Sequence, residues 1–151
     1  IPITTDNINE ADETFYVQLS NGVNAKISST AGKGTGIIIN DDAPTVSIDD
    51  VTVTEGTDKG TTTAIFTVTL SNPTDIPVTV NYTTKDGSAI AVKDYTTKQG
   101  TLTFDAKSTT PQKIDVQIIR DNINEDDETF TVNLTNTGAS NATASATGKI
   151  N

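Results

Sequence analysis

Carboxylates carry the chemistry that this chain can offer. Its 151 residues include 20 acidic and 10 basic side chains, for a net charge of −10, and no Cys or His. The absence of Cys and His excludes thiolate and imidazole metal sites, and it also excludes nucleophiles activated by His. A negative surface repels nucleic acid and anionic membranes, so the natural partners of these acids are cations. We therefore expect no nucleic-acid partner.

One acidic segment occurs twice in the sequence. Residues 6–15 read DNINEADETF and residues 121–130 read DNINEDDETF, so nine of ten positions are kept at an offset of 115. The sequence that follows is also alike, and the second ending aligns at an offset of about 111. We predict that residues 1–43 are the C-terminal part of a preceding repeat and that residues 44–151 are one complete repeat. A chain that begins at Ile1 is expected to be an internal piece of a longer protein.

Period-2 alternation of apolar and polar residues predicts the elements that position these acids. Helical periodicity is missing, and the alternating segments are rich in β-branched and aromatic residues. Strands are predicted at residues 46–48 with 51–54 as one split strand, 64–70, 78–82, 102–104, 114–118, 130–134 and 144–150. Seven strands of this spacing favour an all-β fold, an antiparallel seven-stranded immunoglobulin-like β-sandwich. The preceding repeat would supply the end of its fifth strand, then its sixth and seventh.

Strand direction brings distant acids to one end of such a sandwich. The loops after the first, third and fifth strands, and the exit of the seventh, all lie at the same pole. The acids at these places are Glu55, Asp94, Asp121, Glu125, Asp126, Asp127 and Glu128, with Asp41 and Asp42 after the last strand of the preceding repeat. Clustered carboxylates repel one another unless a cation neutralises them. A hard divalent cation with oxygen ligands fits, and Ca²⁺ tolerates irregular geometry better than Mg²⁺.

Two acidic segments have other interpretations. Glu128 is also the first outward-facing residue of the sixth strand, and Asp49 with Asp50 suits a turn inside the split first strand. The doubled segment does not have the spacing of an EF-hand loop.

Several segments in order resemble the Calx-beta family, which includes modules of sodium–calcium exchangers, integrin β4 and large bacterial surface proteins. The segments that carry the resemblance are Val46-Ser47-Ile48 with Glu55-Gly56, Phe66 to Ser71, Val80 to Ala89, Asp94-Tyr95, Gly100 to Phe104, and Asp121 with Glu125 and Glu128-Thr129-Phe130. The resemblance implies a calcium site. Its ligands would be Glu55, Asp94, Asp121 and Glu125 in the complete repeat, and Asp6, Glu10, Asp41 and Asp42 in the preceding one. Arg120 departs from the family pattern, because exchanger modules have an Asp there.

The predicted function is mechanical. We expect a calcium-binding, non-enzymatic structural repeat of a long secreted, extracellular or cell-surface protein, in which Ca²⁺ stiffens the junction between repeats and the whole serves adhesion. The expected partners are adjacent repeats or neighbouring copies of the same protein. No apolar run approaches the ~20 residues that span a bilayer, so we expect no membrane insertion by this piece.

Two other functions stay open. Residues 1–43 are too few to bury a core alone, so a neighbouring copy could complete them by strand addition and build a filament. The chain could also be a regulatory calcium sensor, as in exchangers. An enzyme is the weakest alternative: a pair such as Asp94 and Glu125 could hydrolyse a glycosidic bond, but the chain lacks an aromatic platform for a sugar.

Overall fold

The fold is built from β-strands. The computed structural model describes residues 1–136, 138–141 and 143–151, and in these residues no helix is long and apolar enough to cross a membrane. The strands are β1 (Glu13–Gln18), β2 (Lys33–Ile38), β3 (Val46–Ile48), β4 (Val51–Val53), β5 (Gly60–Leu70), β6 (Val78–Asp86), β7 (Gln99–Phe104), β8 (Gln112–Arg120), β9 (Glu128–Asn136) and β10 (Thr143–Ile150). The all-β prediction is confirmed.

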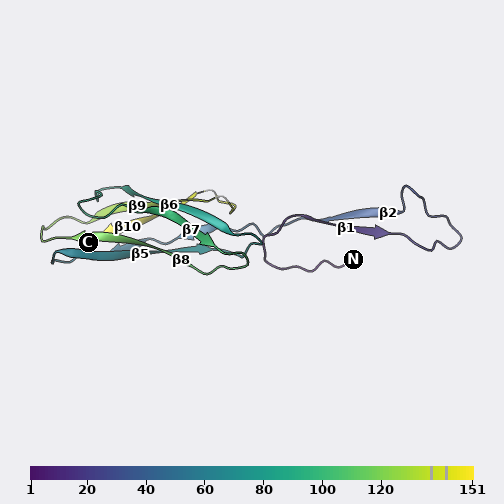
Figure 1. Cartoon of the computed structure of the whole chain (residues 1–151), viewed down its shortest axis with the longest axis horizontal. Coiled ribbons are helices and arrows are strands. Elements are labelled where there is room, and N and C mark those ends of the chain that lie inside the picture. The colour runs from purple at the N-terminus through teal and green to yellow at the C-terminus, as the bar shows by residue number, and fades with distance from the viewer. Residues whose placement is uncertain (137, 142) are drawn as a thin grey trace.

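The strands from β3 to β10 form two facing sheets, the predicted sandwich (Figure 1). One sheet has the order β4-β10-β9-β6-β7 and the other has the order β3-β5-β8. Neighbours are antiparallel, except that β4 runs parallel to β10. The predicted first strand is divided between the sheets, which makes eight strands where seven were predicted.

Asp49 and Asp50 mark the crossing from one sheet to the other. The Asp49 N–H still bonds to Thr67 O in the smaller sheet, at 3.3 Å. The Asp50 carboxylate already accepts the N–H of Thr147 in the larger sheet, at 2.6 Å. A pair of short polar residues therefore lets one extended segment serve both sheets, because Asp side chains readily bond backbone groups outside regular pairing.

The core lies between these two sheets and belongs to the complete repeat alone. Every buried member of the main hydrophobic cluster lies between Val46 and Ile150. The inward phases predicted for β5, β8 and β9 are confirmed, since their alternate residues are buried. They include Phe66, Val68, Val116, Ile118, Phe130 and Val132, each fully buried. Residues 46–150 thus bury a hydrophobic core of their own.

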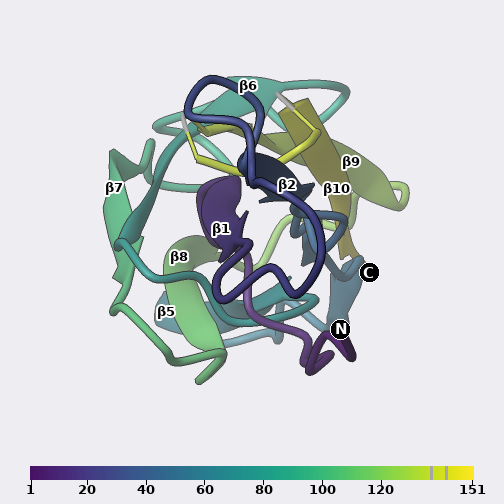
Figure 2. The same cartoon turned by 90° about the vertical axis from the view of Figure 1, so that its right-hand side faces the viewer.

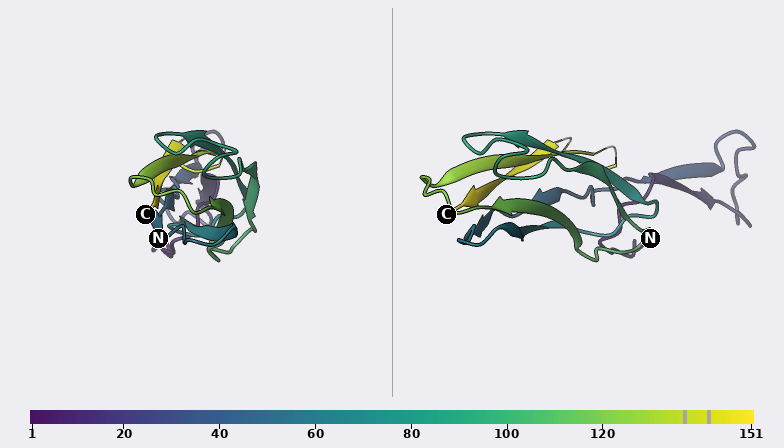
Figure 3. Two further views of the ribbon diagram at one scale, coloured as in Figure 1. Left: turned by 90° about the vertical axis from the view of Figure 1, so that its left-hand side faces the viewer. Right: turned by 60° about the vertical axis from the view of Figure 1, so that its left-hand side comes forward.

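The partial repeat consists of a two-stranded sheet that projects from one end of the sandwich (Figures 1 and 3). Seen along the long axis, β1 and β2 stand over that end (Figure 2). Residues 1–5, expected as the end of a fifth strand, form no strand. The physical reason is that residues 1–43 contain no counterpart of β5, which is the strand that pairs with β8 in the complete repeat.

Candidate metal centre

Asp94 is placed by a compact turn between β6 and β7. Its carboxylate accepts the N–H of Ile90 at 2.6 Å, and its backbone N–H returns to Ile90 O at 3.0 Å. Its carbonyl accepts the N–H of Ile119, which ties the turn to β8 at 2.9 Å. Val92 has a φ of 77°, an uncommon value for a β-branched residue, so the turn beside Asp94 is strained.

Tyr95 anchors this turn in the core. It is fully buried and stacks on Phe130, with ring centroids 4.5 Å apart and planes at 16°. Its hydroxyl donates to Asp86 at 2.6 Å, and burial followed by this hydrogen bond raises the pKa of Tyr95 to about 12. The bond from Tyr95 in turn lowers the pKa of Asp86. Asp94 therefore stands on a rigid support.

Two acids of the doubled segment meet Asp94. Carboxylate oxygens of Asp94, Glu125 and Glu128 all lie within 4.8 Å of one another. Glu125 lies in the loop after β8 and is exposed, whereas Asp94 and Glu128 are half-buried. In the described part of the chain this is the one group of three acids close enough to hold a metal ion together. We call it the acidic trio.

Glu55 and Asp121 lie beside the acidic trio. The Glu55 carboxylate accepts the backbone N–H of Asp121 at 3.0 Å, and the Asp121 carboxylate accepts the N–H of Ile123 at 2.7 Å. Both acids add to the negative potential at Glu125. The structure thus brings the four acids predicted for the complete repeat to one pole, with two in the trio and two next to it.

Two acids of the trio, Glu125 and Glu128, have raised pKa values. Loss of solvation first, and then the charges of Asp94, Asp121 and Glu55, raise the pKa of Glu125 above its ordinary value of 4.5, while Lys93 opposes this shift. Loss of solvation and the charge of Asp94, followed by a hydrogen bond with Asp94, raise the pKa of Glu128. Such shifts mark carboxylates that a cation would stabilise in their charged form.

Other charged residues at this pole are directed elsewhere. Asp127 pairs with Lys149 at 2.6 Å, and Asp126 is exposed outside the trio. Arg120 is half-buried, and its side chain lies beside the loop after β4, where a Cβ on Gly56 would be 3.4 Å from it. A Cβ on Gly60 would come within 3.0 Å of the Arg120 guanidinium, so this glycine makes room for that side chain.

The acids predicted for the preceding repeat line a second site. Asp6, Glu10, Asp41 and Asp42 border one cleft of about 240 Å³, together with Glu13. Asn40 holds the cleft in shape through three hydrogen bonds. Its backbone N–H donates to Asp12 at 2.9 Å, its side-chain amide donates to Asn9 at 2.9 Å, and its side-chain oxygen accepts the N–H of Glu10 at 3.0 Å.

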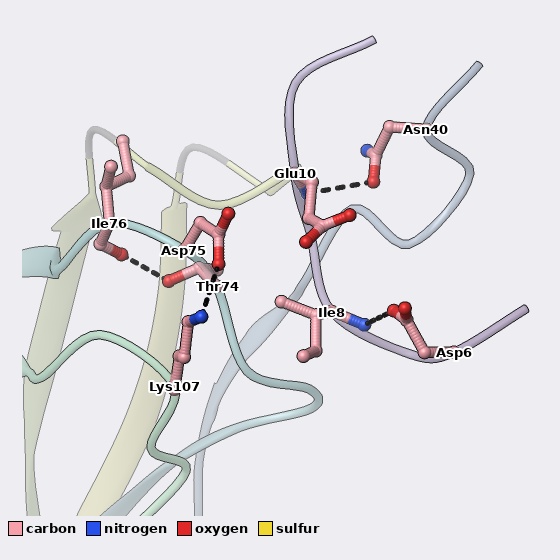
Figure 4. A network of polar contacts seen from close by, with 8 residues as sticks. All are labelled: Asp6, Ile8, Glu10, Asn40, Thr74, Asp75, Ile76 and Lys107. Atoms are coloured by element: carbon pink, nitrogen blue, oxygen red, sulfur yellow. Dashed lines mark hydrogen bonds and ion pairs between the residues drawn. The ribbon is translucent and has the colours of Figure 1, made fainter. Parts of the chain in front are cut away.

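The complete repeat contributes charge to this second site. Loss of solvation, then Asp75, Asp6 and Glu13, raise the pKa of Glu10, and Lys107 lowers it. Asp75 and Lys107 belong to the complete repeat and form an ion pair of 3.4 Å at the junction (Figure 4). An acidic residue of one repeat is therefore influenced by the repeat that follows.

Glu128 has a second role that strand alternation does not reveal. It is the first residue of β9, as the alternation predicts, and its carboxylate also lies close to Asp94. Its counterpart Glu13 lines the second cleft in the same way. The signal in the sequence was the retention of this Glu in both copies of the doubled segment.

Comparison with known proteins identifies the family. The Calx-beta domain family model matches residues 1–43 and residues 40–151, so the chain belongs to the Calx-beta domain family. No curated protein matches the chain.

Two solved structures share the fold. One is the apo-form Calx CBD1 domain, with 22% identity and a TM-score of 0.53, covering 70% of this chain and 97% of that one. Another is the calcium binding domain CBD12 of CALX1.1, with 23% identity and a TM-score of 0.54, covering 69% of this chain and 44% of that one.

Proposed function

We propose that this chain is a calcium-binding structural repeat of a long extracellular or cell-surface protein, in which Ca²⁺ stiffens the junctions between repeats. The observation that carries the proposal is the acidic trio. Its ligand atoms are all carboxylate oxygens within 4.8 Å of one another, and two of its members have raised pKa values. A solved relative in fold is itself described as a calcium binding domain.

The donor set favours Ca²⁺ over other metals. Oxygen ligands suit hard cations, whereas zinc sites use mostly Cys and His, which the chain lacks. Mg²⁺ requires near-ideal octahedral geometry, but Ca²⁺ accepts six to eight oxygens in irregular arrangements. An exposed Glu125 beside half-buried Asp94 and Glu128 suits the more tolerant ion.

Stiffening follows from the composition of the second cleft. Asp41 and Asp42 belong to the linker, while Asp6 and Glu10 belong to the loop before β1, and all four border the same cleft. A cation held there would tie the linker to the preceding repeat. The carbonyl of Asp42 already accepts a hydrogen bond from the Asn72 side chain of the complete repeat. The linker would then be fastened on both sides.

The proposed location of the protein is outside the cell. Calcium sites of extracellular modules bind with dissociation constants of about 10⁻⁴–10⁻³ M, which the calcium level outside cells fills. Adjacent repeats, or neighbouring copies of the protein, would be the partners, and the array would act as an adhesive spacer without enzymatic activity.

Isothermal titration calorimetry tests the proposal. We expect Ca²⁺ to bind the chain with a saturable signal and Mg²⁺ to bind more weakly. Glu128→Gln removes one charge of the trio and should weaken binding, whereas Asp127→Asn, outside the trio, is the matched control. Absence of calcium binding at millimolar concentrations would refute the proposal.

The sensor alternative differs in affinity. A regulatory module that responds inside cells needs a dissociation constant of about 10⁻⁷–10⁻⁵ M. The same titration therefore separates it from a structural site.

The filament alternative draws support from the exposed face of the partial repeat. Val17 on β1 and Leu19 directly after this strand are 42% and 59% exposed. A neighbouring copy that covered this face would give a particle mass that rises with concentration in analytical ultracentrifugation. Val17→Asp should abolish that rise, and a constant monomer mass would exclude the filament.

A further inference from the structure

The junction between the repeats contains a short backbone pairing. Asn9, in the loop before β1, donates its N–H to Pro73 O at 2.9 Å and accepts the N–H of Asp75 at 3.0 Å. Asn9 and Thr74 form an isolated parallel bridge. Both hydrogen bonds use main-chain atoms, so they depend on the shape of the two loops and not on particular side chains.

The complete repeat presents its loop between β5 and β6 in a fixed shape. Thr74 is 1% exposed and its hydroxyl donates to the carbonyl of Ile76 (Figure 4). The carbonyl of Thr74 accepts the N–H of Lys107 at 2.8 Å. The Lys107 ammonium also pairs with Asp75. These contacts lie within the complete repeat, so the loop does not depend on the preceding repeat for its conformation.

The loop that docks there exists a second time in the chain. Asp121 to Glu125 repeats Asp6 to Glu10 residue for residue. Its local conformation is also the same, since Ile8 N–H bonds the Asp6 carboxylate at 2.9 Å and Ile123 N–H bonds the Asp121 carboxylate at 2.7 Å. The turn is thus formed whether or not a partner is present.

The two copies differ in what covers them. Ile8 and Asn9 are half-buried at the junction, whereas Asn124 is exposed and Ile123 is 63% exposed. Among the described residues, no backbone hydrogen bond joins residues 122–124 to another segment. This second loop lies at the end of the sandwich opposite β1 and β2 (Figure 1).

We propose that residues 122–125 are a docking surface for a following Calx-beta unit, which is a second copy of this repeat. The loop of that unit equivalent to residues 71–76 would pair with Asn124, the Asn124 N–H donating to position 73 and the Asn124 carbonyl accepting from position 75. The occupant is defined by the chain itself, because the same five residues already hold that loop at Asn9. The inference rests on the tandem arrangement in the proposed function, and it needs no calcium.

Amide hydrogen exchange on a lengthened chain tests this pairing. Asn151 would be followed directly by a second copy of residues 40–151, since the strand register places Asn151 at the position of Ile39, directly before Asn40 and the linker. In the presence of chelator, we expect the amide of Asn124 to exchange at least about tenfold more slowly than in the 151-residue chain. The amide of Asn9 serves as the internal reference. An unchanged rate at Asn124 would overturn the proposal.

A matched pair of variants in the second copy identifies the contact. Asp75→Pro removes the donating N–H, whereas Asp75→Ala removes only the side chain. The first should reduce the protection of Asn124 and the second should retain it. Amides of β5 and β8 in the second copy report whether it is folded, and equal protection of Asn124 in a folded Asp75→Pro chain would contradict the pairing.

The same chain separates failure of docking from failure of the proposed function. Slow exchange at Asn124 in chelator without calcium binding in calorimetry would leave the docking surface and remove the calcium site. Calcium binding with unchanged exchange at Asn124 would leave the calcium site and remove the docking surface.

Discussion

The two copies of the doubled segment adopt the same local structure in different surroundings. Phe15 pairs with Gly36 and Phe130 pairs with Gly148, in the same antiparallel register. This register aligns β2 with β10 at an offset of 112 residues, close to the 111 expected from the sequence alignment. Yet Val132 is fully buried and its counterpart Val17 is 42% exposed. Nine shared residues out of ten therefore specify a turn and a strand pairing, while burial comes from strands elsewhere in the repeat.

The acids of the two copies also lie in different surroundings. Glu125 and Glu128 are joined by Asp94 from the loop between β6 and β7 of their own repeat. Glu10 has no such loop in residues 1–43, and the acid of the other repeat that raises its pKa is Asp75, across the junction. A shared segment thus supplies half of each site, and its neighbours supply the rest.

The largest difference in stability between the two copies is expected when the aromatic ring of the doubled segment is removed. Phe130→Ala should destabilise the complete repeat by about 3–5 kcal/mol, because Phe130 is fully buried and packs on Phe66 and Tyr95. Phe15→Ala should change the stability of the complete repeat by less than ~1 kcal/mol, since Phe15 lies outside its core. Urea unfolding, followed by the far-ultraviolet circular dichroism of the β-sheets, measures both. Equal losses would show that the two repeats share one core.

A smaller difference in stability is expected when the glycines opposite these rings are replaced. A Cβ on Gly148 would come within 2.4 Å of the Phe130 ring, and a Cβ on Gly36 within 2.3 Å of the Phe15 ring. Gly148→Ala should cost about 1–3 kcal/mol because the packed ring cannot move away. Gly36→Ala should cost less, since the half-buried Phe15 can turn toward solvent. Thermal unfolding compares them, and a greater cost at Gly36 would contradict this account of the two environments.

Much of the fold could be predicted from the sequence, and less of the site. Alternation placed Phe66, Val116 and Phe130 inside, because strand phase alone fixes which face a residue occupies. The division of the first strand between sheets depends on pairing with β10, which no local pattern reveals. The approach of Glu128 to Asp94 depends on a turn anchored by Tyr95 in the core, a contact between segments far apart in the chain.

Calcium affinity should distinguish the acids of the trio from their neighbours. Asp94→Asn and Glu128→Gln each remove a charged ligand, and each should weaken calcium binding about tenfold or more at the complete repeat. Asp127→Asn should have little effect because Asp127 pairs with Lys149. Calorimetric titration gives the dissociation constants. A loss at Asp127 as large as that at Glu128 would place the ion elsewhere.

The smallest expected effect is a dependence of stability on pH. Glu125 and Glu128 hold their protons more tightly when folded, since their pKa values lie above 4.5. Without calcium, their contribution is therefore most favourable below about pH 4.5 and declines as the pH rises through the raised values. Melting temperatures in chelator should show this decline, and Glu128→Gln should reduce it. Added calcium should remove it, and an identical pH profile with and without calcium would contradict the assignment.

Small-angle X-ray scattering of the chain lengthened by a second copy of residues 40–151 tests the central claim most directly. We expect a longer and more uniform particle with calcium than with chelator, because cations at the acidic poles fasten each linker to its neighbours. Identical scattering in calcium and in chelator would contradict it.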